Sequence, residues 1–217
     1  MKIKIYRDFQ QRTDKWMEIK RGKTSGSGIK PILSAKSKGP LETYAWKLIA
    51  QLEDKEPAKY VGGYLSAAVQ WGVDMEPEAI TKFEEKTGKI VEDVAWVDSL
   101  DPKLVHKSGC SPDGIIDIYE WIEVKCLATE NHMKYVAANV LPLEYKPQVL
   151  NYFVINPDLK KVYFILYDPR LKTKSKRLHI IEVTREEYSK EIDGLYDKLV
   201  VFNDMKSAMY KGFLGIQ

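Results

Sequence analysis

The chain has 217 residues, 44% of them hydrophobic and 30% charged, so it can build a folded core and is not a disordered tail. No apolar run approaches the ~20 residues that span a bilayer, and the first residues lack the apolar stretch of a signal peptide. These absences predict a cytoplasmic protein with no membrane partner. The two cysteines, Cys110 and Cys126, are too few for a four-cysteine zinc or iron–sulfur site, and we expect free thiols.

The net charge of +3 is unevenly distributed along the chain. Residues 1–40 hold 11 Lys/Arg against 3 Asp/Glu, a balance of +8, so the remaining residues carry −5. A second basic run, RLKTKSKR, occupies residues 170–177. Each run alone is typical of a solvated loop. Beside a cluster of carboxylates, two such runs would instead indicate a protein that binds phosphate backbones and metal ions.

The first third of the chain is predicted to be mainly helical. Residues 13–20 and 41–53 show helical patterns, separated by loops rich in Gly, Ser and Lys. A long helical pattern covers residues 64–87, with apolar side chains three and four residues apart. Within it, Pro77 predicts a kink or a restart near Glu76, and Gly88 predicts the C-cap.

Strand-like runs dominate the rest of the chain. They cover residues 89–97, 104–108, 114–120, 121–126, 161–167 and 177–183, with helices predicted at 130–139 and 142–156. Thr184 and Glu187 form a capping box for a last helix running to about Met209. The order predicts an α/β fold with a central mixed β-sheet flanked by helices. We expect one domain over residues 1–217, with the helical and basic region 1–60 packed on its core.

One stretch, SPDGIIDIYEWIEVKC at residues 111–126, combines a turn with a candidate site. Pro-Asp-Gly is a typical turn sequence. In a strand, residues two apart share a face, so Glu123 and Lys125 point together while Ile122 and Val124 point the other way. A turn at residues 118–120 would bring Asp113 opposite Glu123. Two carboxylates and an ammonium would then converge.

This group of side chains would suit metal-assisted hydrolysis. Two carboxylates, with the Val124 carbonyl as a further oxygen, match the ligands of Mg²⁺. Lys125 would position or deprotonate the attacking water, while the ion lowers that water's pKa. The same spacing also arises by chance, and a solvated strand face is the structural alternative.

Further motifs accompany this one along the chain. SPDG followed by EVKC resembles the PD-(D/E)xK nuclease signature. Four other blocks match in order: Trp16 with IKRGKTSGS, WGVDME ending at Glu76, QVLNY from Gln148 to Tyr152, and YDPR at residues 167–170. Together they resemble the lambda exonuclease-like (YqaJ-type) viral recombinases. Trp16 and Trp71 are read most simply as core aromatics.

The resemblance implies a phage-type recombination nuclease with the PD-(D/E)xK, restriction-endonuclease-like core. It would be a Mg²⁺-dependent exonuclease, with Mn²⁺ able to substitute, that degrades the 5′-ended strand of linear duplex DNA and leaves 3′ overhangs. Asp113 and Glu123 would bind metal and Glu76 would complete a two-ion site. The structural alternative for an inward-facing Glu76 is a residue at the start of a kinked helix, with no role in metal binding. Gln148 would hold the phosphate or Lys125, and Tyr152, one helical turn on, would contact the DNA or its phosphate.

The N-terminal block departs from the family pattern at the pocket for the DNA 5′-phosphate. Where the family has an arginine two residues before the glycine, this chain has Lys20, followed by Arg21. Lysine lacks the bidentate fork of arginine, although either cation could bind phosphate. Ser27 matches the family's phosphate-contacting serine, with Gly26 in place of the usual alanine. The alternative for both cations is an exposed helix end.

The resemblance also implies partners and leaves other functions open. It implies a ring-shaped homotrimer around DNA and a partner that anneals single strands, and Lys36 and Lys38 would track the DNA backbone. An endonuclease of restriction or junction-resolving type could use the same core. A non-catalytic DNA-binding module is a third candidate, although Asp113, Glu123 and Lys125 are all present.

Overall fold

A computed structural model describes residues 2–55 and 66–216. Its elements run in the order β1 (Ile3–Tyr6), α1 (Asp14–Lys20), the 3₁₀ turn η1 (Gly26–Gly28), α2 (Ile29–Ser34), α3 (Lys38–Glu53), α4 (Ala67–Thr87), β2 (Trp96–Ser99), β3 (Gly109–Cys110), β4 (Gly114–Ile115), β5 (Glu120–Lys125), α5 (Thr129–Ala138), α6 (Lys146–Ile155), β6 (Lys161–Tyr167), the 3₁₀ turn η2 (Lys174–Lys176), β7 (Leu178–Thr184) and α7 (Ser189–Leu214).

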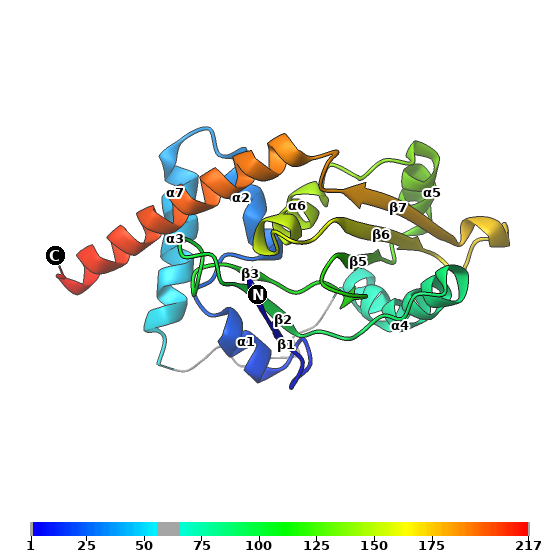
Figure 1. Cartoon of the computed structure of the whole chain (residues 1–217), viewed down its shortest axis with the longest axis horizontal. Coiled ribbons are helices and arrows are strands. Elements are labelled where there is room, and N and C mark those ends of the chain that lie inside the picture. The colour runs from blue at the N-terminus through cyan, green and yellow to red at the C-terminus, as the bar shows by residue number, and fades with distance from the viewer. Residues whose placement is uncertain (1, 56–65, 217) are drawn as a thin grey trace.

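The described strands form two sheets (Figure 1). One is antiparallel, in the order β1-β2-β3. The other has the order β4-β5-β6-β7 and is mixed, because β5 and β6 run parallel while the outer pairs are antiparallel. Helices flank this second sheet, so the predicted α/β class with a mixed sheet is confirmed. The division into two sheets was not predicted.

Strand β5 separates two packed layers. Its alternating side chains point to opposite faces. Ile122 and Val124 pack against Ala79 and Phe83 of α4. Trp121 points to the other face, where α6 lies, and its ring is 5.9 Å from that of Tyr152. Each large side chain buried in this way stabilises the fold by ~1.5–3 kcal/mol. The α6 face also receives Glu123, which is the reason a charged side chain becomes buried there.

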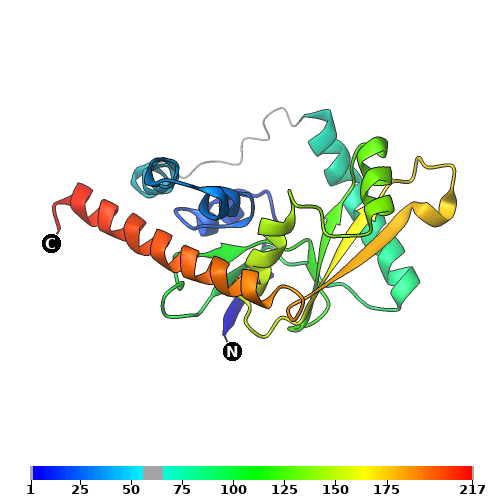
Figure 2. The same ribbon diagram turned by 90° about the horizontal axis from the view of Figure 1, so that it is seen from above.

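The described part of residues 1–60 packs on the same core. Ile29, Ile32, Ala45 and Leu48 belong to one buried cluster with the strands and α6. Helix α3 lies against α7, the long C-terminal helix whose last turns extend beyond it in both views (Figures 1 and 2). The basic N-terminal segment is therefore held against the body of the protein.

Several predicted strands are shorter than expected or absent. Residues 104–108 form turns, because Asp101 accepts backbone N–H bonds from Lys103, Leu104 and Val105. Of the runs 89–97 and 114–120, only Trp96–Val97, Gly114–Ile115 and Glu120, the first residue of β5, lie in strands. Asp117 closes a turn by accepting the N–H groups of residues 119 and 120. Short polar side chains here outcompete strand pairing. β1 and α2 were not predicted.

The helices differ from the predictions mainly at their ends. α4 continues through Pro77 without a restart and ends at Gly88, whose φ of 70° fits the predicted C-cap; residues 64 and 65 of the predicted helix lie outside the described residues. Thr184 ends β7 instead of capping α7, and its hydroxyl accepts the N–H of Glu187 within a turn. α7 therefore begins at Ser189 and runs past Met209. None of the described helices combines the length and apolar character needed to cross a membrane.

Candidate active site

The predicted hairpin at residues 113–125 is present. β4 and β5 pair with Gly114 opposite Ile122, a register that places Asp113 opposite Glu123. The Val124 N–H donates to Asp113 Oδ2 over 2.7 Å, which fixes the aspartate beside β5. A residue far away in the sequence stabilises the turn before Asp113, because Gln11 Nε2 donates to the Pro112 carbonyl (2.8 Å). Trp16 Nε1 donates to Ser111 Oγ at 2.8 Å.

Glu123 lies at the centre of the cluster and is 0% exposed. One carboxylate oxygen contacts the ammonium of Lys125, and the other accepts a hydrogen bond from the Tyr152 hydroxyl. Burial, together with the nearby charge of Asp113, raises the pKa of Glu123 to about 7, although Lys125 and Tyr152 oppose the shift. The pKa of Glu123 therefore lies near neutral pH, where the carboxyl group can gain or lose a proton.

Lys125 shares the face of Glu123, as the strand alternation predicts. Burial acts to lower the pKa of Lys125, but the charges of Glu123 and Asp113 outweigh it and raise that pKa. Its ammonium also lies 5.3 Å from the ring centre of Tyr145. A lysine held in its charged form donates hydrogen bonds and supplies positive charge, but it accepts no proton.

Asp113 and Glu76 form the second half of the cluster. Burial raises the pKa of Asp113, while Lys125, the Val124 N–H and Arg12 lower it. The pKa of Glu76 rises to about 7 through burial and through the charge of Asp113. Glu76 comes from α4, beyond the hairpin, and its Oε2 lies 3.5 Å from the Arg12 guanidinium. The helix thus brings a third carboxyl group close enough to interact with Asp113.

Gln148 and Tyr152 lie on α6, as the family pattern suggested. Gln148 Nε2 donates to the Tyr152 hydroxyl at 3.0 Å, and that hydroxyl donates to Glu123. Tyr152 was expected beside DNA, but its side chain is 0% exposed. The structure therefore places Tyr152 behind Glu123 and not on the surface. Gln148 is half-buried and is linked to the Glu123 carboxylate only by way of the Tyr152 hydroxyl.

Sequence reasoning missed the loop at residues 10–12. Arg12 contacts Glu76 and lowers the pKa of both Glu76 and Asp113, yet no motif marked it. Gln11 holds the Pro112 carbonyl. The only signal was the surplus of cations in residues 1–40, which did not single out Arg12. Tyr145, beside Lys125, was also missed.

The donor chemistry of this cluster fits a hard divalent cation. In the described ranges, no three His, Cys, Asp or Glu side chains are already arranged around one point to hold a metal ion. Asp113, Glu123 and Glu76 nevertheless offer carboxylate oxygens, and the charge of Asp113 raises the pKa of the other two. A divalent cation would offset that repulsion, and oxygen ligands are those that Mg²⁺ prefers.

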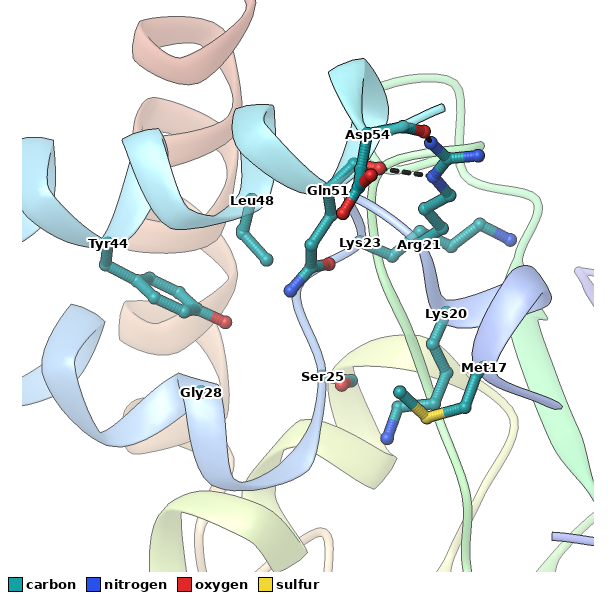
Figure 3. Close-up of a pocket in the computed structure, with 10 residues that line it drawn as sticks. All are labelled: Met17, Lys20, Arg21, Lys23, Ser25, Gly28, Tyr44, Leu48, Gln51 and Asp54. Atoms are coloured by element: carbon teal, nitrogen blue, oxygen red, sulfur yellow. Dashed lines mark hydrogen bonds between the residues drawn. The ribbon is translucent and has the colours of Figure 1, made fainter. Parts of the chain in front are cut away.

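A separate cavity of about 270 Å³ lies between the α1–α2 segment and α3 (Figure 3). Lys20 points into it and has no acidic partner among the described residues; its ammonium lies 3.4 Å from the ring centre of Trp16. Burial lowers the pKa of Lys20 to about 8. The other lining residues come from both sides of the cavity: Met17, Arg21, Lys23, Ser25, Gly28, Tyr44, Leu48, Gln51 and Asp54.

The two neighbouring cations of this cavity are committed to protein partners. Arg21 donates to the carbonyls of Gln51, Leu52 and Asp54 at the end of α3. Lys23 forms an ion pair with Asp98 (2.7 Å). Within residues 2–55 and 66–216, Lys20 is therefore the member of the predicted pair Lys20 and Arg21 whose charge has no acidic partner.

The remaining predicted phosphate contacts are less defined. The backbone of Ser27 lies in η1, and its side chain is outside the described part of the structure. Lys36 and Lys38 are exposed, with Lys38 at the start of α3 and Lys36 just before it. Cys110 and Cys126 are buried free thiols, as expected.

Comparison with known proteins gives a family and a fold. The YqaJ-like viral recombinase domain matches residues 15–156. An alkaline exonuclease from Laribacter hongkongensis superposes with a TM-score of 0.74 at 24% identity, covering 93% of this chain and 96% of that one. The same protein in complex with dAMP gives a TM-score of 0.75 with the same identity and coverage. A phage-related exonuclease from Haemophilus somnus gives 0.56 at 13% identity, covering 89% and 95%. No curated protein sequence matches the chain.

Proposed function

The chain belongs to the YqaJ-like viral recombinase domain family, and from that membership we propose that it is a divalent-metal-dependent DNA exonuclease. It digests linear duplex DNA from its ends in the 5′-to-3′ direction and leaves 3′ overhangs for recombination. The fold shared with solved exonucleases supports this proposal.

One observation carries the proposal: Asp113, Glu123 and Lys125 converge on one hairpin beside Glu76. The Val124 N–H fixes Asp113, and Glu123 is clamped between Lys125 and Tyr152. Holding three carboxyl groups together, with Glu123 fully buried and the other two partly buried, costs stability unless a cation compensates them. Lys125 and Arg12 compensate only part of that charge, which supports a site built to bind a further cation.

The metal would be held by oxygen atoms of Asp113, Glu123, Glu76 and the Val124 carbonyl. We propose Mg²⁺ as the metal, with Mn²⁺ as a substitute, and two ions bound in the site. When bound, such a cation lowers the pKa of a ligated water and offsets charge building on the phosphate. Without a cation the carboxylates of the cluster repel each other, so the site favours binding of a cation.

Lys125 serves in this scheme as a donor and not as a base. Because its neighbours raise its pKa, it stays protonated at neutral pH and can orient the attacking water or donate to a phosphate oxygen. Tyr152 fixes the orientation of Glu123, and Gln148 fixes that of the Tyr152 hydroxyl. We propose that Gln148 contacts the phosphate of the DNA, while Tyr152 supports the Glu123 carboxylate.

The cavity around Lys20 would take the 5′-phosphate of the DNA end. Lys20, which has no acidic partner among the described residues, and the hydroxyls of Ser25 and Tyr44 supply donors to a phosphate (Figure 3). The solved neighbour that was crystallised with dAMP supports a nucleotide phosphate as a ligand of this family. Ser27 remains a proposed contact, Arg21 a support for the cavity wall, and Lys36 and Lys38 contacts to the DNA backbone.

The wider assembly is also a proposal. We propose one nuclease domain over residues 1–217 that acts as a homotrimer around DNA, with a single-strand annealing protein as its partner. The family resemblance supports both, and the contacts of the described chain neither require nor oppose them.

Digestion of matched DNA substrates tests the function. A linear duplex and a covalently closed circle of the same sequence are incubated with the protein in Mg²⁺ or in EDTA, and labels at the 5′ or 3′ end report polarity. We expect digestion of the linear duplex only, with Mg²⁺ only, and early release of the 5′ label. Efficient nicking of the closed circle would instead identify an endonuclease.

A further inference from the structure

The C-terminal helix α7 lies behind the Lys20 cavity, and its buried side chains contact Tyr44 and Gly22 in the cavity wall and the adjacent loop. Phe202, Asn203 and Lys206 are at most 5% exposed. α7 begins at Ser189, beyond the residues 15–156 that match the family, and none of the family's motif blocks lies on it. Two polar groups buried on one helix face therefore need an explanation other than the hairpin chemistry.

Lys206 is the more unusual of the two polar residues. Its ammonium donates to the Gly22 carbonyl over 2.6 Å, and it has no carboxylate partner in the described ranges. Burial and the charge of Lys107 lower the pKa of Lys206 to about 8. A buried ammonium without a counter-ion costs stability. Its contact with Gly22 is thus held at an energetic cost to the fold.

Gly22 is the residue around which the cavity loop turns. Its φ is 68°, and a Cβ there would lie 2.5 Å from Leu52 Cδ2, so glycine is required. Its N–H donates to Gln51 Oε1 of α3 at 3.0 Å, while its carbonyl accepts from Lys206. The peptide groups of this turn are therefore fixed from two sides. Lys20 precedes the turn and Ser25 follows it.

Asn203 and Phe202 extend the same support. Asn203 Nδ2 donates to Ser108 Oγ at 2.9 Å, and Ser108 Oγ lies 2.5 Å from Thr24 Oγ1, next to Ser25. Phe202 stacks on Tyr44, with ring centres 5.3 Å apart, and Tyr44 lines the opposite wall of the cavity. One face of α7 thus contacts both walls.

We propose that Lys206 and Asn203 of α7 are positioning residues for recognition of the 5′-phosphate at a DNA end. By fixing the Gly22 turn and Thr24, they determine where Lys20 and Ser25 present their donors. The inference rests on the proposed exonuclease function and on the cavity as its end-binding site. Neither residue touches the DNA itself.

Kinetics on two duplexes test the proposal. Initial rates are measured against concentration for the same linear duplex with a 5′-phosphate or a 5′-hydroxyl, for wild type, Lys206→Met and Asn203→Ser. Lys198→Met is the matched control, because Lys198 lies on α7 and donates to Leu33 O from an exposed position (3.1 Å). Thermal unfolding confirms that each variant is folded.

We expect the wild type to have the lower KM for the 5′-phosphorylated duplex. Loss of a charged hydrogen bond predicts that Lys206→Met raises that KM about tenfold. Its kcat and its KM for the 5′-hydroxyl duplex stay unchanged, and Lys198→Met matches the wild type. Asn203→Ser shows a smaller loss in the same direction.

Three results would overturn the proposal. The first is a folded Lys206→Met protein with the wild-type ratio of the two KM values. The second is an equal rise in KM on both duplexes, which marks a structural role. The third is a wild type that digests the 5′-phosphorylated and the 5′-hydroxyl duplex alike. If Lys206→Met does not fold, Asn203→Ser decides in its place by the same criteria. A wild type that digests neither duplex would instead remove the exonuclease proposal on which the inference rests.

Discussion

The hairpin cluster and the Lys20 cavity differ in how their charges are compensated. In the cluster, Glu123 contacts Lys125 and Glu76 contacts Arg12, so two of the three carboxyl groups already contact a cation of the protein. In the cavity, Lys20 has only the ring of Trp16 beside it in the described structure. Paired charges hold a geometry before any ligand arrives, whereas an unpaired cation gains its partner from the ligand. The comparison assigns chemistry to the first region and end recognition to the second.

The strongest test of this division is removal of the lysine in the cluster. Lys125→Met leaves Glu123 buried without its cation, and we expect kcat to fall by ~10²–10⁴-fold on any linear duplex. Lys161→Met is the matched control, since Lys161 lies on the neighbouring strand and pairs with Glu182 nearer the surface. Steady-state digestion rates measure both. A Lys125→Met protein as active as wild type would contradict the proposed site.

Removal of the lysine in the cavity should affect binding and not the chemical step. Lys20→Met is expected to raise the KM for a 5′-phosphorylated duplex about tenfold, because a charge-assisted contact to phosphate is lost. Lys15→Met, on the same helix but paired with Asp8, should leave KM unchanged. A fall in kcat at saturating DNA would show that the two regions do not act separately.

The pH dependence of the end preference sharpens the same point. Burial lowers the pKa of Lys20 to about 8, so this lysine is charged below that pH and becomes neutral above it. The wild-type preference for a 5′-phosphate should therefore be full near pH 7 and decline as the pH rises through about 8. The ratio of the two KM values, measured from pH 6.5 to 9.5, reports this. In Lys20→Met the ratio should stay flat.

Arg12 tests whether the cluster depends on its distant cation. Arg12 lowers the pKa of Glu76, so Arg12→Met should raise it further and move the acid side of the rate–pH profile to higher pH. A shift of about one pH unit predicts activity about fivefold lower at pH 7 and near wild type at higher pH. Arg7→Met, which breaks an exposed pair with Glu92, is the control.

The smallest expected effect is at Tyr152. Tyr152→Phe removes one hydrogen bond to the buried Glu123, and we expect kcat to fall about threefold and the free energy of unfolding to drop by ~1 kcal/mol. Tyr210→Phe, whose hydroxyl meets Glu53 at the surface, should change neither quantity. Rates and denaturant unfolding measure the pair. An unchanged rate would separate Tyr152 from the catalytic carboxylate.

The two regions also differ in how far the sequence could predict them. Asp113, Glu123 and Lys125 lie on one hairpin, so strand alternation and one turn were enough to bring them together. The positions of Gln148 and Glu76 followed from the family order of motifs. Arg12 could not be predicted, because it reaches Glu76 from a loop 64 residues away and belongs to no motif. The walls of the cavity combine the α1–α2 segment and α3, with α7 packed behind α3, and this packing depends on the whole fold.

A comparison of Lys125→Met and Lys20→Met at saturating DNA tests the central claim most directly. The cleavage rate of each variant is measured in Mg²⁺ on the same duplex with a 5′-phosphate and with a 5′-hydroxyl. The account predicts that Lys125→Met has lost cleavage on both duplexes, while Lys20→Met cleaves both at close to the wild-type rate. Comparable rate losses in the two variants, or a Lys125→Met protein that still cleaves like wild type, would contradict it.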